Sequence, residues 1–147
     1  MYSCSKNYRD ACESGKIIYA SFYRTLVMLN KVQLLNIDIN QYLEKNLVQR
    51  FCLYGCNDIT KLFLQYCEKH DHKPDFIIDS RPNRYECEYP DYAIQKPEDM
   101  IGKISDELVI VMSNYDFNEI ATSLHSSGIP YSQIISIEEL LSSLLEK

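Results

Sequence analysis

The sequence has few glycines and no Cys-x-x-Cys motif: four glycines occur among its 147 residues, and no two of the six cysteines stand three positions apart. Without that motif, a zinc ribbon or a thioredoxin-like redox site has no support. Long apolar runs are also missing, because the longest candidate, residues 17–35, contains Arg24, Asn30, Lys31 and Gln33. A segment with four such side chains is a poor membrane span. We therefore expect no membrane-spanning helix and no metal site.

The first sixteen residues are polar and mixed in charge, so they do not resemble a signal peptide. In a chain that is not exported, cysteines stay reduced. We therefore expect all six cysteines to be thiols and the protein to be cytoplasmic. Cys52 and Cys67 lie in apolar patterns, where a thiol acts as a small hydrophobic group.

Acidic residues are concentrated in the C-terminal two-thirds of the chain. Residues 49–147 contain nine Lys/Arg against seventeen Asp/Glu, whereas residues 1–48 contain six against four. A surface of that charge repels a phosphate backbone, which argues against nucleic-acid binding. The balance of 46% hydrophobic and 24% charged residues is typical of a globular protein.

Residues 1–48 are predicted to form a helical extension. An apolar stripe predicts a helix over about residues 17–29, with Gly15 as a break before it. Asp38 is expected to cap a second short helix. We expect the stripe to be buried against the sheet domain or a second chain, because exposure would forgo about 1.5–3 kcal/mol for each large side chain. The stripe consists of Ile18, Phe22, Leu26 and Leu29.

The pattern changes after residue 46, where short apolar runs alternate with helical segments. This alternation predicts right-handed βαβ crossovers. The predicted fold class is therefore α/β: a Rossmann-like parallel sheet of four to five strands over residues 49–147, with the helical extension 1–48 before it. The expected strands are 50–54, 76–78, 93–94, 108–112 and 134–135. Helices are expected from Asp58, which would cap the first, and from about residues 96, 117 and 137.

The candidate site residues follow from the sheet topology. In doubly wound sheets, ligands bind beyond the carboxyl ends of the strands, near the point where strand order reverses. The loops after the first, second and fourth strands should therefore meet at one edge. These loops contain Gly55, Cys56, Asn57 and Asp58, then Asp79, Ser80 and Arg81, and finally Ser113 and Asn114.

The first of these loops is an incomplete dinucleotide-binding turn. The fingerprint has three glycines, but this chain has Gly55, Asn57 and Thr60 at those positions. Asn57 obstructs the approach of a pyrophosphate, and Thr60 is expected to push the following helix away from the strand. Asp58 would compete for the amides of the helix start. A simple βα turn with Asp58 as cap is the alternative, and the cofactor, if there is one, stays undefined.

The loop after the second strand offers a ribose contact. Asp79 follows the glycine turn by about twenty residues, where an acidic side chain accepts hydrogen bonds from ribose hydroxyls. It is equally explained as a turn residue. Arg81 and Arg84 could pair with a phosphate, or balance the nearby acidic residues Glu86, Glu88 and Asp91. Tyr85, Tyr89, Tyr92 and Tyr115 could stack on a base or cover the sheet edge.

Two further groups suggest chemistry only weakly. Cys67, His70 and His72 lie close together, but no fourth ligand has metal-site spacing, and a polar helix end explains them. Cys56 beside a helix start could be a thiolate nucleophile. Nothing in the sequence brings His125 near it to act as a base.

The run from Phe51 to Leu141 resembles the small Rossmann-like domains of bacterial sugar-modification and polysaccharide-biosynthesis proteins, including the N-terminal domain of sugar O- and N-acyltransferases of the left-handed β-helix type. The resemblance implies that a nucleotide-linked sugar is held by the loop residues Gly55, Asn57, Asp79 and Asn114. The chain departs from that family in its degraded glycine turn, and it lacks the hexapeptide-repeat domain that performs the acyl transfer. Four segments carry the resemblance: 53–59, 76–80, 93–100 and 109–135.

Three functions remain open from the sequence. The first is an accessory domain that binds a nucleotide or nucleotide-sugar and works with glycan enzymes. The second is a ligand-free protein-interaction module on a Rossmann scaffold, with the N-terminal helix as a surface for a homodimer or a partner protein. The third, an NAD-dependent sugar-modifying enzyme, is disfavoured by the incomplete glycine turn, so the chain is not expected to be an enzyme.

Overall fold

The computed structural model describes residues 2–82, 89 and 91–146, and only the backbone of residues 2–14 and 17. Its core is a five-stranded, all-parallel sheet in the order β3-β2-β1-β4-β5, which confirms the predicted α/β class. The strands are β1 (Phe51–Tyr54), β2 (Ile77–Ile78), β3 (Ile94–Gln95), β4 (Leu108–Val111) and β5 (Ile134–Ser136). Each overlaps a predicted strand.

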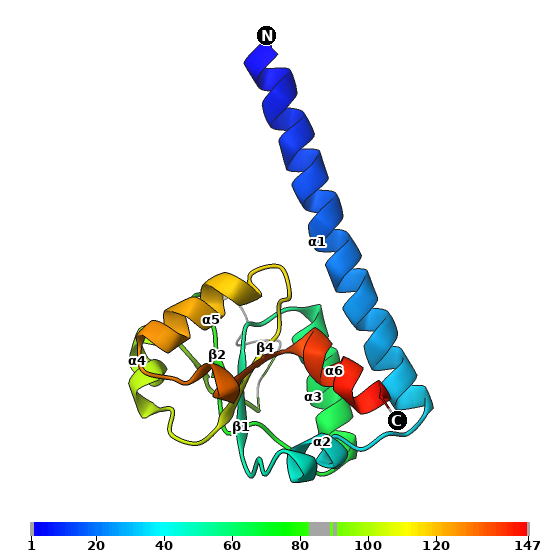
Figure 1. Cartoon of the computed structure of the whole chain (residues 1–147), viewed down its shortest axis with the longest axis vertical. Helices are drawn as coiled ribbons and strands as arrows, with labels where there is room; N and C mark the ends of the chain where they lie inside the picture. Colours follow the sequence, from blue (N-terminus) through cyan, green and yellow to red (C-terminus); the bar gives the residue numbers. More distant parts are fainter. Residues whose placement is uncertain (1, 83–88, 90, 147) are drawn as a thin grey trace.

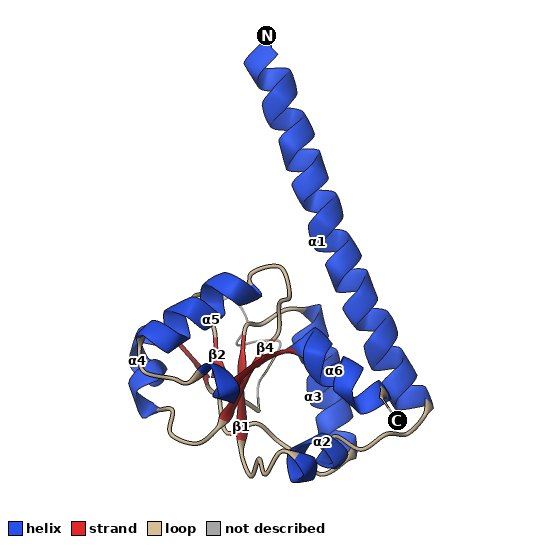
Figure 2. Ribbon diagram, viewed as in Figure 1, coloured by secondary structure: helices blue, strands red, loops and turns tan. Residues whose placement is uncertain are grey.

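Helices follow β1, β3, β4 and β5 as expected (Figures 1 and 2). Pro97 occupies the first turn of its helix, where a missing N–H is harmless. Gly128, at φ 104°, follows the helix after β4 in the left-handed conformation that glycine favours. The helices are α1 (Tyr2–Leu34), α2 (Asn40–Lys45), α3 (Asp58–Lys69), α4 (Pro97–Met100), α5 (Phe117–Ser126) and α6 (Ile137–Leu145), with short 3-10 turns at Ile101–Lys103 and Tyr131–Gln133.

The sheet is buried on both faces, which explains why its strands are continuous apolar runs. Successive side chains of a strand point to opposite faces. Leu53 and Ile110 pack in the core under α1, α3 and α6, whereas Cys52, Val109 and Val111 pack in a second core against α5. The result is a three-layer α/β/α arrangement, with the switch in strand order between β1 and β4 (Figure 2).

Helix α1 differs from its prediction in two ways. It continues through Gly15, because a single glycine lowers helix stability by only about 1 kcal/mol and does not end a helix. Its buried face is also rotated from the predicted stripe: Leu29 is buried, Phe22 and Leu26 are half-buried, and Ile18 is 45% exposed. The N-terminal half of α1 extends past the α/β body (Figure 1). Ile18 lines a cavity with Met112 and Tyr115 instead of packing in the core. The fully packed face consists of Ser21, Thr25, Leu29 and Val32.

The connection from α1 to the sheet is held by α3. The hydroxyl of the buried Tyr66 donates a hydrogen bond to the carbonyl of Ile37 at 2.7 Å. Helix α2 begins at Asn40, one residue later than a cap at Asp38 predicts, although the Asp38 side chain still accepts the Asn40 N–H at 2.9 Å.

Candidate functional site

The β1–α3 turn is tight, as Gly55 predicts. Gly55 has φ 109°, a conformation that side chains rarely adopt, and its N–H donates to the carbonyl of Ile78 at 2.7 Å. Its own carbonyl accepts the hydroxyl of Thr60 at 2.8 Å. The first glycine of the incomplete fingerprint therefore keeps its conformational role.

Asn57, not Asp58, caps α3, so the predicted cap is wrong. Asn57 has the extended backbone of a cap residue, and its Oδ1 accepts the Thr60 N–H at 3.1 Å. The Thr60 hydroxyl accepts the Asn57 N–H at 3.2 Å, which completes a capping box. Asp58 is the first helical residue and is exposed. Thr60 is fully buried and closes the turn, instead of forcing the helix away from the strand.

Asp79 links the two loops at this edge of the sheet. Its Oδ2 accepts the N–H of Cys56 at 2.9 Å, and its Oδ1 accepts the N–H of Arg81 at 2.8 Å. Both carboxylate oxygens are therefore engaged by backbone amides. A fixed negative charge lies beside the turn at which a pyrophosphate would bind in a dinucleotide-binding protein. The side chains of Ser80 and Arg81 are exposed.

The loops after β1 and β4 are joined through Asn57. Its Nδ2 donates to the carbonyl of Met112 at 3.0 Å, across the switch in strand order. The hydroxyl of Tyr89 donates to the Asn57 carbonyl at 2.7 Å. The side chain of Asn57 thus ties the loop after β1 to the end of β4, and its backbone carbonyl is held by Tyr89.

Helix α1 lies over this switch point and contacts Asn114. The Asn114 Nδ2 donates to the Thr25 Oγ1 at 2.6 Å, and its Oδ1 accepts the Glu138 N–H at 3.2 Å. The Thr25 hydroxyl in turn donates to the carbonyl of Ser21 at 3.1 Å. Arg24 adds an ion pair to Glu138 at 2.9 Å. Asn114 is therefore a three-way junction between β4, α1 and α6.

A cavity of 210 Å³ remains between α1 and the carboxyl edge of the sheet. Three predicted site residues, Asn57, Ser113 and Asn114, line its sheet side. Helix α1 forms the opposite wall through Ile18, Ser21, Phe22 and Thr25, with Met112 and Tyr115 completing the lining. The structure thus brings together part of the predicted site. The other six predicted residues do not line this cavity: Gly55, Cys56, Asp58, Asp79, Ser80 and Arg81.

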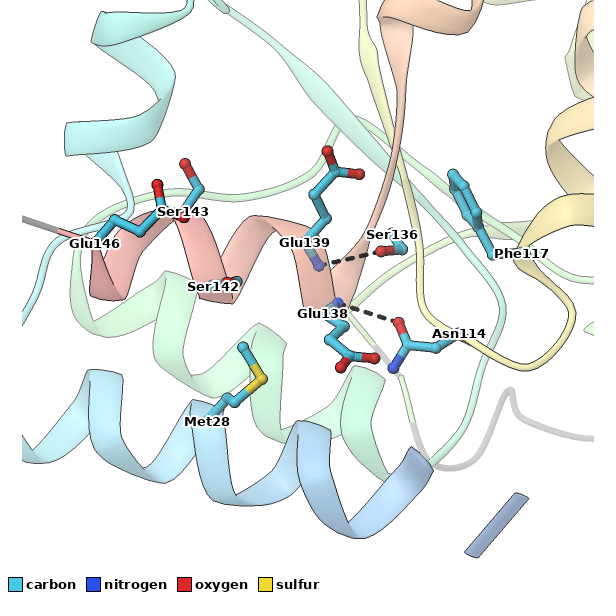
Figure 3. Close-up of a pocket in the computed structure, with 9 residues that line it drawn as sticks. All are labelled: Met28, Asn114, Phe117, Ser136, Glu138, Glu139, Ser142, Ser143 and Glu146. Atoms are coloured by element: carbon cyan, nitrogen blue, oxygen red, sulfur yellow. Dashed lines mark hydrogen bonds between the residues drawn. The ribbon is translucent and has the colours of Figure 1, made fainter. Parts of the chain in front are cut away.

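Asn114 also lines a second cavity, of 510 Å³, which runs along α6 from Ser136 to Glu146 and includes Met28 of α1 and Phe117 of α5 (Figure 3). Ser136 caps α6 by accepting the Glu139 N–H at 3.1 Å, and Met28 of α1 points toward α6. Three carboxylates, Glu138, Glu139 and Glu146, are among its lining residues. That charge disfavours a phosphate group here.

Sequence reasoning missed Ser21 and Thr25, the α1 residues that face the switch point. Their signal was available: two small polar residues four positions apart interrupt the apolar residues of α1 on one helical face. Thr60 was also missed as a cap partner, although Asn-x-x-Thr before an apolar run has capping-box spacing.

The weaker candidates do not assemble into sites. Cys67 is buried, while His70 and His72 lie 3.7 and 3.8 Å from the carboxylate of Asp38. Within the described part of the chain, no group of three or more His, Cys, Asp or Glu could hold a metal ion. Cys56 belongs to the core under α3, whereas His125 stacks on Tyr131 at the end of α5, on the other face of the sheet. Arg84, Tyr85, Glu86 and Glu88 lie outside the described residues.

Tyr92 and Lys96 have the Tyr-x-x-x-Lys spacing of NAD-dependent sugar oxidoreductases, but not the geometry. On a helix, residues four apart share one face. Here the two residues of β3 lie between them, so the pair is not on a helix, and an extended step of four residues spans about 13 Å. Burial and the neighbouring Glu68 carboxylate raise the pKa of Tyr92 to about 12, whereas an acid–base catalyst needs a pKa near the working pH.

Comparison with protein-family models, with curated proteins and with solved structures found no match. Among residues 2–82, 89 and 91–146, no helix is long and apolar enough to cross a membrane, in line with the interrupted apolar run of α1.

Proposed function

We propose that this chain is a protein-interaction module, in which the Rossmann-like domain holds and presents helix α1. The observation that carries the proposal is the contact between Asn114 and Thr25 at 2.6 Å. Asn114 follows β4 at the switch point, where a ligand-binding protein of this fold would contact its ligand. In this chain the same side chain binds the protein's own helix.

The hydrogen bonds of the β1–α3 turn support this proposal. The N–H groups of Cys56, Asn57 and Thr60 already donate to side chains of Asp79, Thr60 and Asn57. A phosphate group would have to displace these acceptors. It would also meet the negative charges of Asp58 and Asp79, which repel an anion. The turn therefore favours a structural role.

The size of the cavity at the switch point points the same way. Pockets for small molecules and cofactors usually have volumes of about 300–1,000 Å³. The 210 Å³ available beneath α1 is too small to enclose a dinucleotide or a nucleotide-sugar. Such a ligand would need α1 to move away.

Helix α1 offers a surface to a partner. Its N-terminal half projects past the body (Figure 1). In its other half, Tyr19 and Tyr23 are 70% and 58% exposed. Tyrosines are enriched at protein interfaces because they combine a large apolar ring with a hydroxyl.

The proposal is tested by placing a photo-crosslinking amino acid at Tyr19 or Tyr23 in the source cell. We expect a discrete adduct with a protein at both positions. The matched control is Thr122, an exposed residue of α5 on the opposite face of the sheet, which should give none. Absence of any adduct at Tyr19 and Tyr23 would contradict the proposal.

A second candidate is the accessory nucleotide- or nucleotide-sugar-binding domain that the family resemblance implies. Its support is the position of Asn57, Ser113 and Asn114 together in one cavity at the switch point. Calorimetric titration with AMP, UDP, UDP-sugars and NAD tests it, repeated on Gly55→Val, which would block close approach to the turn. Saturable binding that is lost in Gly55→Val would place this candidate first.

A further inference from the structure

Helix α1 has a stripe of mostly apolar residues beside its packed face, exposed except for the half-buried Leu26 and Val27. At 100° per residue, six residues between Tyr19 and Leu34 share one face of about 100°, and the exposed Lys16 extends that face toward the N-terminus. The packed face, with Thr25 and Leu29, lies elsewhere on the helix. Within the six, Tyr19, Tyr23 and Leu34 are 70%, 58% and 77% exposed. This outer stripe consists of Tyr19, Tyr23, Leu26, Val27, Asn30 and Leu34.

The spacing of the outer stripe is palindromic. Successive members are separated by 4, 3, 1, 3 and 4 residues, so the pattern is symmetric about the midpoint between Leu26 and Val27. A two-fold axis through that midpoint would set a second α1 antiparallel to the first. Each stripe residue would then face another stripe residue, as an isologous interface requires.

The residues that face one another in this arrangement are chemically compatible. Tyr19 lies opposite Leu34 of the second copy, which pairs an aromatic ring with an aliphatic side chain. Tyr23 lies opposite Asn30 of the second copy, and a hydroxyl and an amide can form a hydrogen bond. A single asparagine in such a seam favours one register over the others.

A groove beside the stripe accommodates one of these side chains. It has a volume of 360 Å³ and lies between α1 and α3. Because Asn30 is part of its lining, the residue that faces Asn30 in the antiparallel pair, Tyr23 of the second copy, is aimed at this groove. The lining residues are Leu26, Val27, Leu29, Asn30, Gln33 and Leu62.

The two-fold axis limits the paired segment to residues 19–34 of each helix, because residue 19 of one copy faces residue 34 of the other and α1 ends at Leu34. The projecting half of each α1, before residue 19, therefore extends beyond the end of the other helix.

We propose that the partner of α1 is a second copy of this chain, paired antiparallel through the outer stripe. This proposal rests on the proposed function, since it names the occupant of the same surface. The stripe residues of two copies bury on the order of 1,000 Å², near the lower limit for a specific interface, so the dimer dissociates readily.

The test uses the full chain in sedimentation velocity over a concentration series. We expect the wild-type mass to rise from the monomer value of 17.2 kDa toward twice that value. Leu34→Glu should weaken the dimer about tenfold or more, since it places a charge in the apolar contact with Tyr19. The matched control is Leu35→Glu: Leu35 is the next residue, 66% exposed but outside the stripe, and its variant should dimerise like the wild type.

A charge pair tests the antiparallel register directly. Tyr19→Lys alone should weaken the dimer as Leu34→Glu does. Combined in one chain, the two changes place Lys opposite Glu twice. The double variant should therefore dimerise about tenfold more tightly than the product of the two single effects predicts. The reversed pair, Tyr19→Glu with Leu34→Lys, should behave in the same way, and circular dichroism checks that every variant is folded.

The outcomes separate this inference from the proposed function. A wild-type chain that stays monomeric at about 1 mM, or a dimer that is indifferent to Leu34→Glu, overturns the second-copy proposal. So does a double variant that shows only the product of the single effects. If the crosslinker at Tyr19 or Tyr23 then still captures a different protein, the interaction function stands and only its partner was wrong.

Discussion

The contact between Asn114 and Thr25 gives the sharpest prediction for the stability of the fold. Asn114→Ala removes two hydrogen bonds, to the Thr25 hydroxyl at 2.6 Å and from the Glu138 N–H at 3.2 Å. Each contributes about 0.5–1.5 kcal/mol net, so we expect the free energy of unfolding to fall by about 1–3 kcal/mol. Thr25→Val removes the partner hydroxyl and keeps the shape of the side chain.

The assay is urea unfolding, followed by circular dichroism and by tyrosine fluorescence, because the chain has no tryptophan. All variants are compared at one protein concentration, since association would shift apparent stability. In a double-mutant cycle, Asn114 and Thr25 should show a coupling of about 1 kcal/mol. The control is Asn118→Ala, an exposed residue of α5, which should stay within about 0.5 kcal/mol of the wild type. If Asn114→Ala is as mild as this control and the coupling is zero, α1 is not held at the switch point as described.

Three further predictions follow from other contacts. Asn57→Ala should lower the free energy of unfolding by at least about 0.5–2 kcal/mol, because it removes the cap of α3. Asp58→Ala should change the free energy of unfolding little. Equal effects of the two substitutions in urea unfolding would refute the cap assignment. Cys67 should be alkylated only as fast as the protein unfolds, because burial raises the pKa of its thiol. Mass spectrometry of the peptide that contains Cys67 measures the labelling rate. Rapid labelling in the native state would contradict this prediction. A hydrogen bond from Arg50 lowers the pKa of Asp106, so this pair should stabilise the fold at pH values above the ordinary Asp pKa of about 4 and lose that effect as the pH falls through the lowered pKa. The free energy of unfolding, measured along a pH series, should depend less on acid pH in Arg50→Gln than in the wild type. An unchanged pH profile would count against the pair.

The strands and helices of the α/β domain were predictable because their signals are local. The strands β1, β2 and β4 are apolar runs buried in the sheet, and the helices α3, α5 and α6 have an apolar periodicity that one sequence window reveals. The parallel direction of the strands was predictable from the alternation of strands and helices along the chain. The final helix, Ile137–Leu145, illustrates this, since apolar residues at helical spacing follow the cap residue Ser136 directly.

The packing of α1 was not predictable from hydrophobicity. The predicted stripe assumed that the most apolar face is the buried one. Instead, Thr25 is buried because Asn114, almost ninety residues away along the chain, contacts its hydroxyl. Ile18 is 45% exposed because it faces a cavity beside Met112 and Tyr115 and does not pack in the core. Contacts of such long sequence separation leave no periodic trace in either segment.

The positions of the candidate residues in the fold were predictable, but their hydrogen-bond partners were not. The carboxyl-edge rule located Asn57, Asp79 and Asn114 correctly at one edge of the sheet, close to the switch in strand order. It could not indicate that each side chain is engaged by the protein itself. That outcome depends on which loop amides and which helix come within hydrogen-bond distance.

The side-chain amide of Asn114 offers the most direct test of the claim that the switch point binds α1 and not a nucleotide. In a nuclear magnetic resonance experiment, its NH₂ protons should show a nuclear Overhauser effect to Thr25. Their shifts should stay constant when UDP-sugar, AMP or NAD is added in excess. Loss of the effect to Thr25, together with a saturable shift of the Asn114 amide on adding one of these nucleotides, would contradict the account and assign this edge of the sheet to a ligand.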